Sequence, residues 1–395
     1  MIVKKMQALG EKRSVIREIF EYGNARRAEI GAENVFDFSL GNPSVPAPDA
    51  VGEALIKMLK ESDSVSLHGY TSAPGDMGVR SAIADYLNKT YKVGVKPTDL
   101  YMTVGAAASL SACLSAVASA GEEVVVFAPF FPEYRVFTEQ TGASLRIVPA
   151  DEKNFEINFD ALKDALSEKT AAVIINSPNN PSGAVISEAS IIRLAEMLKA
   201  AEEKYGHVIY LIADEPYREL VYDDITVPYV TNYYDDTLVC YSFSKSLSLP
   251  GERIGYVLVS PSAKEHNAVY AAICGAGRAL GYVCAPSLFQ KLLPHCLGLV
   301  SDLATYKLNR DLLYEGLSSD GFTLKKPDGA FYLFMKSPEA DANAFCERAK
   351  KYELLLVPGD DFACPGYVRI AYCVKTDQIR RSLPAFAALA KEYGL

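Results

Sequence analysis

Short and nearly unbroken apolar runs recur along the middle of the chain. Each has the length of a strand, is rich in valine and isoleucine, and lacks the alternation typical of a strand with one face in water. Such runs indicate strands that are buried on both faces. The runs are residues 122–129, 171–178, 207–217, 237–244 and 254–260. Helical spacing between several of them, as at residues 188–206, predicts an α/β fold in which helices cover a mostly parallel sheet.

The pattern of the chain changes towards the C-terminus. Residues 286–319 keep helical spacing throughout and predict a long helix. Beyond it, residues 329–336 and 367–373 predict strands, and residues 377–394 predict a closing helix. Residues 1–29 also mix charged and apolar positions at helical spacing. These segments together predict a smaller α+β region beside the large sheet.

The chain length supports two domains rather than one. A chain of 395 residues, 49% of them hydrophobic and 23% charged, is an ordinary globular chain that is too long for one typical core. We predict a large domain over residues 46–288 and a small domain built from residues 1–45 and 289–395.

Charge and cysteine usage narrow the possible partners. A formal net charge of −9 argues against nucleic acid as a main ligand. Eight dispersed cysteines without a C-x-x-C pair predict free thiols in a reducing compartment, and four scattered histidines predict no metal site. The sequence has neither the apolar core of a signal peptide nor an apolar stretch of ~20 residues, so we expect a cytoplasmic protein without membrane contact.

Polar residues follow directly after four of the apolar runs. The segments are "APFFPEY", "NSPNNPSG", "DEPY" and "SFSK". In open α/β sheets, ligands bind beyond the carboxyl ends of the strands, so these residues should share one site. Lys245 of "SFSK" is placed to act as an amine nucleophile, although a lone lysine is more often a surface charge. Asp214 of "DEPY" is a carboxylate at the end of an apolar run, where a helix cap or an ion pair would also explain it.

A third element of the site is a candidate phosphate cradle. "TVGAAASL" passes through Gly105 into small residues that open a helix, where free N–H groups and the helix dipole attract a phosphate. Ser242 and Arg253 are further donors for such an anion. A lysine nucleophile, a buried carboxylate, a phosphate cradle and an aromatic residue together describe a pyridoxal phosphate site.

At these motifs the chain resembles the class I/II aminotransferases, the fold-type-I pyridoxal-phosphate enzymes of the aspartate aminotransferase superfamily. The resemblance covers nearly the whole chain, from "FDFSLGNPS" to "YVRIAYC", and rests on "NSPNNPSG", "DEPY", "SFSK" and "RIGY" in the family's order. It implies that the cofactor is pyridoxal 5'-phosphate and that the reaction belongs to amino acid metabolism.

The resemblance also implies a role for each residue around the cofactor ring. Lys245 would form the internal aldimine, and Asp214 would pair with the pyridinium nitrogen. Tyr217 and Asn180 would donate hydrogen bonds to the phenolic oxygen, and Phe131 would stack on the ring. Lys245, Asp214 and Tyr217 are therefore the expected catalytic residues.

The remaining roles concern the phosphate and the substrate. Tyr70 would reach the phosphate of the neighbouring subunit's cofactor, which implies a homodimer. Arg369 would bind the substrate α-carboxylate, helped by Asn180 and by the backbone of Gly41. The expected ligands of the chain's own phosphate are Gly105, Ala106, Ala107, Ser242, Ser244 and Arg253.

The family implies an enzyme that moves an amino group from an L-amino acid to a 2-oxo acid through the Lys245 aldimine. A C–S β-lyase of the cystathionine type remains the alternative, because it uses the same lysine and aspartate. In one branch of the family a lysine two residues past the phosphate-loop glycine favours dicarboxylates. This chain has Ala107 there, which counts against simple aspartate specificity by that route, although another cation such as Arg278 could substitute. We expect residues 274–281, "CGAGRALG", to form a loop near the subunit interface.

Overall fold

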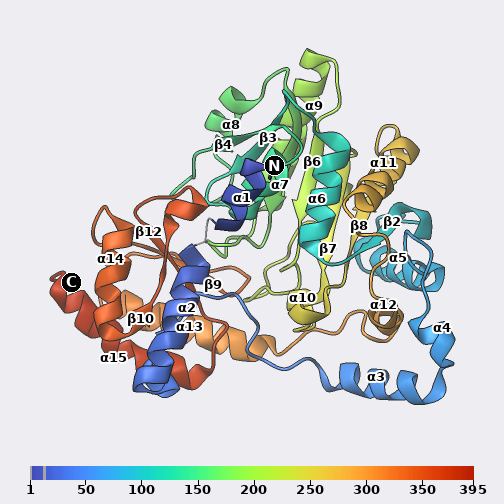
Figure 1. Cartoon of the computed structure of the whole chain (residues 1–395). Coiled ribbons are helices and arrows are strands. Elements are labelled where there is room, and N and C mark those ends of the chain that lie inside the picture. Colours follow the sequence, from blue (N-terminus) through green and yellow to red (C-terminus); the bar gives the residue numbers. More distant parts are fainter. Residues whose placement is uncertain (1, 12–14) are drawn as a thin grey trace.

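The computed structural model describes residues 2–11 and 15–395, and a seven-stranded sheet dominates it (Figure 1). Its strand order is β2-β8-β7-β6-β5-β3-β4, and only the two pairings of β8 are antiparallel. The predicted mostly parallel sheet is confirmed, and the five apolar runs are β3, β5, β6, β7 and β8. The strands are β2 (Leu100–Thr103), β3 (Glu123–Phe127), β4 (Ser144–Val148), β5 (Thr170–Asn176), β6 (Tyr210–Asp214), β7 (Thr237–Ser242) and β8 (Gly255–Val259).

Helices cover both faces of this sheet, which is why its strands are apolar on both sides. In β6, Leu211 and Ala213 pack into one core and Ile212 packs into the other. The first core receives side chains from α3 (Asp49–Glu61), α4 (Ser64–His68), α5 (Met77–Tyr91), α8 (Phe159–Ala165), α9 (Glu188–Tyr205) and α12 (Ser287–Leu292). The second core receives them from α6 (Ala106–Val117), α7 (Glu133–Glu139) and α11 (His266–Ala279).

Local signals set the helix ends in the expected way. The hydroxyl of Ser187 accepts a hydrogen bond from the backbone N–H of Ser190 at 3.3 Å and begins α9. Gly206 ends the same helix in the left-handed region with φ of 76°. The predicted helix at residues 188–206 is therefore confirmed almost to the residue.

A second group of elements lies beside the large sheet and joins the two ends of the chain. Helix α2, blue in Figure 1, lies among the orange and red C-terminal elements. This second group contains two small sheets: the antiparallel sheet β11-β12-β9 and the parallel pair β1-β10. These strands are β1 (Phe36–Asp37), β9 (Tyr332–Lys336), β10 (Leu354–Leu355), β11 (Val357–Pro358) and β12 (Tyr367–Ala371). The remaining α-helices of the described chain are α1 (Lys4–Glu11), α2 (Val15–Ile30), α10 (Phe243–Ser246), α13 (Leu303–Ser319), α14 (Ala342–Ala349) and α15 (Thr376–Glu392). Of these, α10 follows β7 and packs with the large sheet.

Two expectations for the C-terminal half were wrong. The single long helix predicted over residues 286–319 is interrupted between α12 and α13, where Pro294 cannot donate a helical hydrogen bond and Gly298 has φ of 82°. Residues 274–281 were expected to form a loop, but most of them belong to α11. A Cβ atom on Gly277 would lie 2.1 Å from the Tyr101 hydroxyl, so this glycine permits close helix packing instead of a turn.

The apolar side chains near the predicted domain boundary pack with the large sheet. Leu292, Leu293 and Cys296 belong to the first core of that sheet. Leu313 and Leu317 of α13 belong instead to the core of the smaller sheet. Among the helices in the described part of the chain, none has the length and apolar character needed to span a bilayer.

Candidate active site

A cavity of about 310 Å³ opens at the carboxyl ends of β5, β6 and β7. It lies beside the point where the strand order reverses between β3 and β5, the usual ligand position in such sheets. All of the sequence-predicted site residues line it except Gly105 and Tyr70. Among the described residues its lining is Ile16, Gly41, Ala106, Ala107, Leu110, Phe131, Asn176, Asn180, Asp214, Pro216, Tyr217, Ser242, Ser244, Lys245, Pro250, Arg253, Tyr332 and Arg369.

Lys245 lies on α10, the short helix that directly follows β7. Its Nζ atom donates a hydrogen bond to the backbone carbonyl of Gly41 at 2.6 Å and lies 5.4 Å from the centre of the Phe331 ring. Burial lowers the pKa of Lys245 from 10.5 to about 8, because removal from water disfavours the charged amine. A substantial fraction of this amine is thus neutral near physiological pH, as a nucleophile or a base requires.

Asp214 ends β6 and is almost fully buried. Its Oδ2 atom accepts a hydrogen bond from the Tyr134 hydroxyl at 2.5 Å, while its Oδ1 atom is buried and has no partner within the described residues. Burial raises the pKa of Asp214 to about 7, and the Tyr134 hydrogen bond opposes this rise. A buried carboxylate with one oxygen unpartnered and facing a cavity suits a cationic N–H donor.

Sequence reasoning missed Tyr134. It follows Phe131 by three residues in "FFPEY". Tyr134 lies in the first turn of α7 and Phe131 just before that helix, and the two rings make an edge-to-face contact with centroids 5.8 Å apart. Phe131 lines the cavity, whereas Tyr134 lies behind it against Asp214. The spacing of one helical turn was the signal that could have revealed this residue.

Hydrogen-bond donors and positive charge lie together where the cavity meets the start of α6. Helix α6 begins after Gly105, whose φ of 94° is poorly tolerated by other residues. A Cβ atom on Gly105 would lie 3.0 Å from Nη2 of Arg253, so the glycine lets the guanidinium approach the helix end. The Ser242 hydroxyl donates to the Ser244 hydroxyl at 2.7 Å, and Arg253 Nη1 lies 3.5 Å from Ser244 Oγ. This end of the cavity fits an anion such as a phosphate.

Arg369 projects from the middle of β12, and only 2% of its surface is exposed. Its Nη1 atom donates to Asn180 Oδ1 at 3.1 Å, and its Nη2 atom donates to the carbonyl of Ser39 at 2.5 Å. The Nε atom is buried and has no partner in the described part of the chain. Burial lowers the pKa of Arg369, although this group stays charged. An unpartnered N–H on a buried cation favours a carboxylate ligand.

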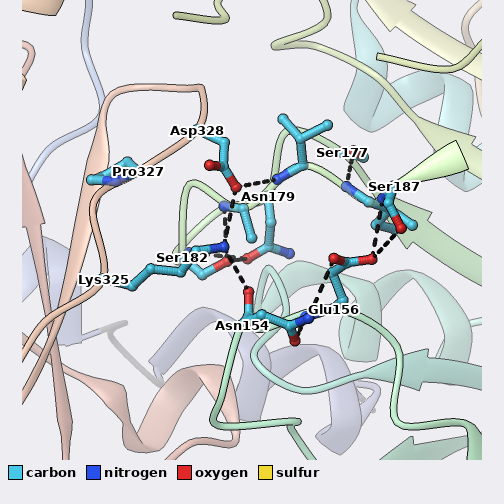
Figure 2. Close-up of polar contacts among 12 residues, drawn as sticks. Asn154, Glu156, Ser177, Asn179, Ser182, Ser187, Lys325, Pro327 and Asp328 are labelled. Carbon is cyan, nitrogen blue, oxygen red and sulfur yellow. Dashed lines mark hydrogen bonds and ion pairs between the residues drawn. The ribbon is translucent and has the colours of Figure 1, made fainter. Parts of the chain in front are cut away.

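The loop that carries Asn180 is fastened to the C-terminal part of the chain (Figure 2). Asn179 Oδ1 accepts from the N–H and hydroxyl of Ser182 at 3.0 and 2.8 Å. Asp328 Oδ2 accepts from the Val185 N–H at 3.3 Å and from Lys325 Nζ at 3.2 Å. These contacts hold Asn180 between the two sheets, where it meets Arg369.

Tyr332 and Tyr70 lie differently with respect to the cavity. Tyr332 lines the cavity, although sequence analysis recognised its segment only as a strand. Its hydroxyl lies 2.9 Å from the Tyr217 hydroxyl. Tyr70 is fully exposed and lies outside the cavity lining of its own chain.

The donor set of the cavity fits pyridoxal phosphate. The unpartnered Asp214 oxygen would meet a protonated ring nitrogen, Lys245 would reach the aldehyde carbon, and the end of α6 with Arg253 would receive the phosphate. These groups occur together in one cavity.

Comparison with known proteins agrees with this assignment. Residues 33–386 match the family model described as aminotransferase class I and II. Aspartate aminotransferase from Thermotoga maritima is 30% identical, covering 89% of this chain and 90% of the relative. A probable aspartate/prephenate aminotransferase from Aquifex aeolicus is also 30% identical, over 90% and 91%. The crystal structure of an aminotransferase from Eubacterium rectale is 55% identical with a TM-score of 0.98, and the match covers 100% of each chain.

The chain therefore belongs to the class I and II aminotransferases, as the sequence motifs predicted. Within that family it is a pyridoxal-phosphate-dependent aminotransferase that acts on amino and 2-oxo acids. The relatives and structures compared are all named aminotransferases, and nothing in them supports the C–S lyase alternative.

Proposed function

We propose that this enzyme exchanges an amino group between an L-amino acid and a 2-oxo acid, with Lys245, Asp214 and Tyr217 as its catalytic residues. The observation that carries the proposal is the convergence of Lys245, Asp214 and Arg369 on one cavity, although Arg369 comes from a different sheet. Pyridoxal phosphate, when bound, carries the amino group and spreads the negative charge that develops at the substrate α-carbon.

Each of these side chains has a separate task in the proposal. Arg369 binds the α-carboxylate and so fixes the α-carbon. Lys245 Nζ, neutral above a pH of about 8, would take the proton from the α-carbon and deliver it to the cofactor carbon that came from the aldehyde, so that the amino group stays on the cofactor. With pyridoxal phosphate bound, Asp214 would keep a proton on the ring nitrogen, and Tyr217 and Asn180 would donate to the phenolic oxygen. Phe131, which lines the same cavity, would stack on the ring.

The phosphate site would keep the cofactor bound when Lys245 is free. Its ligands in this proposal are the backbone N–H groups at Gly105, Ala106 and Ala107 and the side chains of Ser242, Ser244 and Arg253. The backbone of Gly41 closes the substrate side of the cavity. Because the cradle is separate from Lys245, the lysine is free to act as acid and base.

We also propose that the enzyme is a cytoplasmic homodimer. The support for a dimer is the full exposure of Tyr70 outside the cavity lining of its own chain, because the corresponding tyrosine in the family reaches the phosphate of the neighbouring subunit. Equilibrium sedimentation and loss of cofactor affinity in a Tyr70→Phe variant would test it. All eight cysteines are free, which supports a reducing compartment.

The catalytic assignment is tested by spectroscopy and a donor screen. Purified protein should absorb in the visible range, and Lys245→Ala should lose turnover while its circular dichroism is unchanged. Donors, with aspartate first, are screened against 2-oxoglutarate, pyruvate and oxaloacetate. A Lys245→Ala variant that stays active without added amines would refute the role of Lys245. Release of ammonia and a keto acid from cystathionine without any acceptor would indicate a lyase instead.

A further inference from the structure

Tyr332 occupies a position between the two sheets that form the site. It begins β9 and pairs with Ala371 of β12, so Arg369 is its diagonal neighbour on the same face of the small sheet. Only 2% of Tyr332 is exposed, and its side chain lines the cavity. One side chain of the small sheet therefore reaches the cavity at the carboxyl ends of the strands of the large sheet.

The ring of Tyr332 fixes the guanidinium of Arg369. The Arg369 Cζ atom lies 4.8 Å from the centre of the Tyr332 ring and 5.0 Å from that of Phe362. The guanidinium is thus held between two aromatic rings, which favour a cation over their faces. Loss of one ring would leave the carboxylate-binding group free to tilt, and its affinity for the carboxylate would fall.

The hydroxyl of Tyr332 acts on a different residue. It lies 2.9 Å from the Tyr217 hydroxyl, and both tyrosines are buried. Each hydroxyl carries a single proton, so only one of the two donates in this pair. If Tyr217 donates its proton to a ligand in the cavity, then Tyr332 must donate to Tyr217. Tyr332 then determines the direction in which the Tyr217 proton points.

Gly41, whose carbonyl contacts Lys245, leaves room for the Tyr332 hydroxyl. A Cβ atom on Gly41 would lie 1.9 Å from the Tyr332 hydroxyl oxygen, so only glycine leaves room for it. The carbonyl of the same glycine accepts the hydrogen bond from Lys245 Nζ at 2.6 Å. Tyr332 therefore contacts the carboxylate-binding, proton-donating and lysine-holding parts of the site at once.

We propose that Tyr332 is a positioning residue with two separable effects: its hydroxyl orients the Tyr217 proton towards the cofactor, and its ring orients Arg369 towards the substrate carboxylate. The inference rests on the proposed function of Tyr217 and Arg369. It adds to that function a residue that joins the cofactor side and the substrate side of the reaction.

Two variants of the holoenzyme separate the two effects. Tyr332→Phe keeps the ring and removes the hydroxyl. The midpoint of the pH titration of its visible absorption should lie about half a unit or more above the wild-type midpoint. A hydrogen bond from Tyr217 to the anionic phenolic oxygen favours the deprotonated form of the bound cofactor, and Tyr332→Phe would weaken that bond. Its KM for the amino acid should stay within about threefold. Tyr332→Leu removes the ring as well, and the lost cation–π contact should raise that KM roughly 3- to 30-fold.

Tyr372→Phe is the matched control. The Tyr372 hydroxyl donates to the carbonyl of Ala330 at 3.2 Å in the same aromatic cluster, and that carbonyl keeps its bond from Tyr222. This variant should leave both the spectral titration and KM unchanged. The proposal is overturned if Tyr332→Phe titrates like the wild type, or if a folded Tyr332→Leu keeps the wild-type KM. An equal shift in Tyr372→Phe would also overturn it, since the effect would then be general loss of packing.

The outcome for the wild type separates this inference from the function on which it rests. A wild-type enzyme that transfers no amino group from any donor would contradict the proposed function. An active wild type with unaffected Tyr332 variants would contradict only the role of Tyr332. Should Tyr332→Leu fail to fold, the isosteric Tyr332→Phe and its spectral titration still decide the hydroxyl effect.

Discussion

Replacement of Asp214 by Asn should make the cofactor-free protein more stable at neutral pH while it weakens cofactor binding. Asp214 is almost fully buried, and its Oδ1 atom has no partner among the described residues. Without a cation in the cavity, the charged carboxylate is costly to bury. Asparagine has the same shape and can still accept the hydrogen bond from Tyr134, but it carries no charge.

The magnitude follows from the pKa of Asp214, which rises from 3.8 to about 7 on folding. The native state holds a proton on this group more tightly than the unfolded state, so its contribution falls as the pH rises from about 4 to about 7. At about 1.4 kcal/mol for each pH unit in this window, the charged form costs the native state roughly 4 kcal/mol above pH 7. Asp214→Asn removes that cost, and its advantage should grow by about 2.5 kcal/mol between pH 5 and pH 8.

The assay is urea unfolding of wild type and Asp214→Asn, both freed of cofactor, at several pH values. Asp164→Asn, at an exposed position on α8, provides the same charge change at the surface. The free energy of unfolding of Asp214→Asn, relative to that of the wild type, should rise with pH. That of Asp164→Asn should not. A parallel pH dependence for wild type and Asp214→Asn would refute the reasoning, because burial would then not control this carboxyl group.

Three other changes have directions set by the structure. Lys245→Met should stabilise the cofactor-free protein at pH 7 by roughly 3 kcal/mol, and the gain should vanish as the pH rises from about 8 to 10.5, as urea unfolding would show. Gly105→Ala should weaken pyridoxal phosphate binding about tenfold in an equilibrium titration, because the added Cβ atom would lie 3.0 Å from Arg253 Nη2 and displace a phosphate donor. Unchanged affinity would show that the α6 end does not hold the phosphate. Arg218→Met should cost roughly 3–5 kcal/mol in urea, because the buried Glu215 carboxylate, now 2.6 Å from Arg218 Nε, would lose its partner.

Much of the large sheet and most of the cavity lining could be predicted because they depend on local signals. Continuous apolar runs give buried strands, and a parallel sheet brings the carboxyl ends of those strands together. Asp214 ends β6, and Lys245 lies on the short helix that follows β7. Strand prediction alone therefore places both residues at the carboxyl edge of the sheet. The family motifs then supplied Arg369, which no local pattern connects to that edge.

The features that escaped prediction depend on contacts between distant segments. Tyr332 reaches the cavity only because β9 pairs with β12, and this pairing is not encoded in its own neighbourhood. Gly277 was misjudged for a similar reason. A glycine in a sequence often signals a turn. Here Gly277 lies inside α11, because the Tyr101 side chain leaves no room for a Cβ atom at that position. Composition does not distinguish these two uses of glycine.

The pairing of β1 with β10 also has a consequence for synthesis of the chain. Phe36 is hydrogen-bonded into a ladder with Leu354, so the N-terminal strand has no sheet partner until more than three hundred further residues have been translated. At about 5–20 residues per second, that delay is roughly 15–60 s. Once β8 has been made, at residue 259, the large sheet has all its strands and is able to fold, while β1 and the apolar face of α2 remain uncovered. The nascent chain should therefore expose a chaperone-binding segment at its N-terminus until the ribosome has nearly finished.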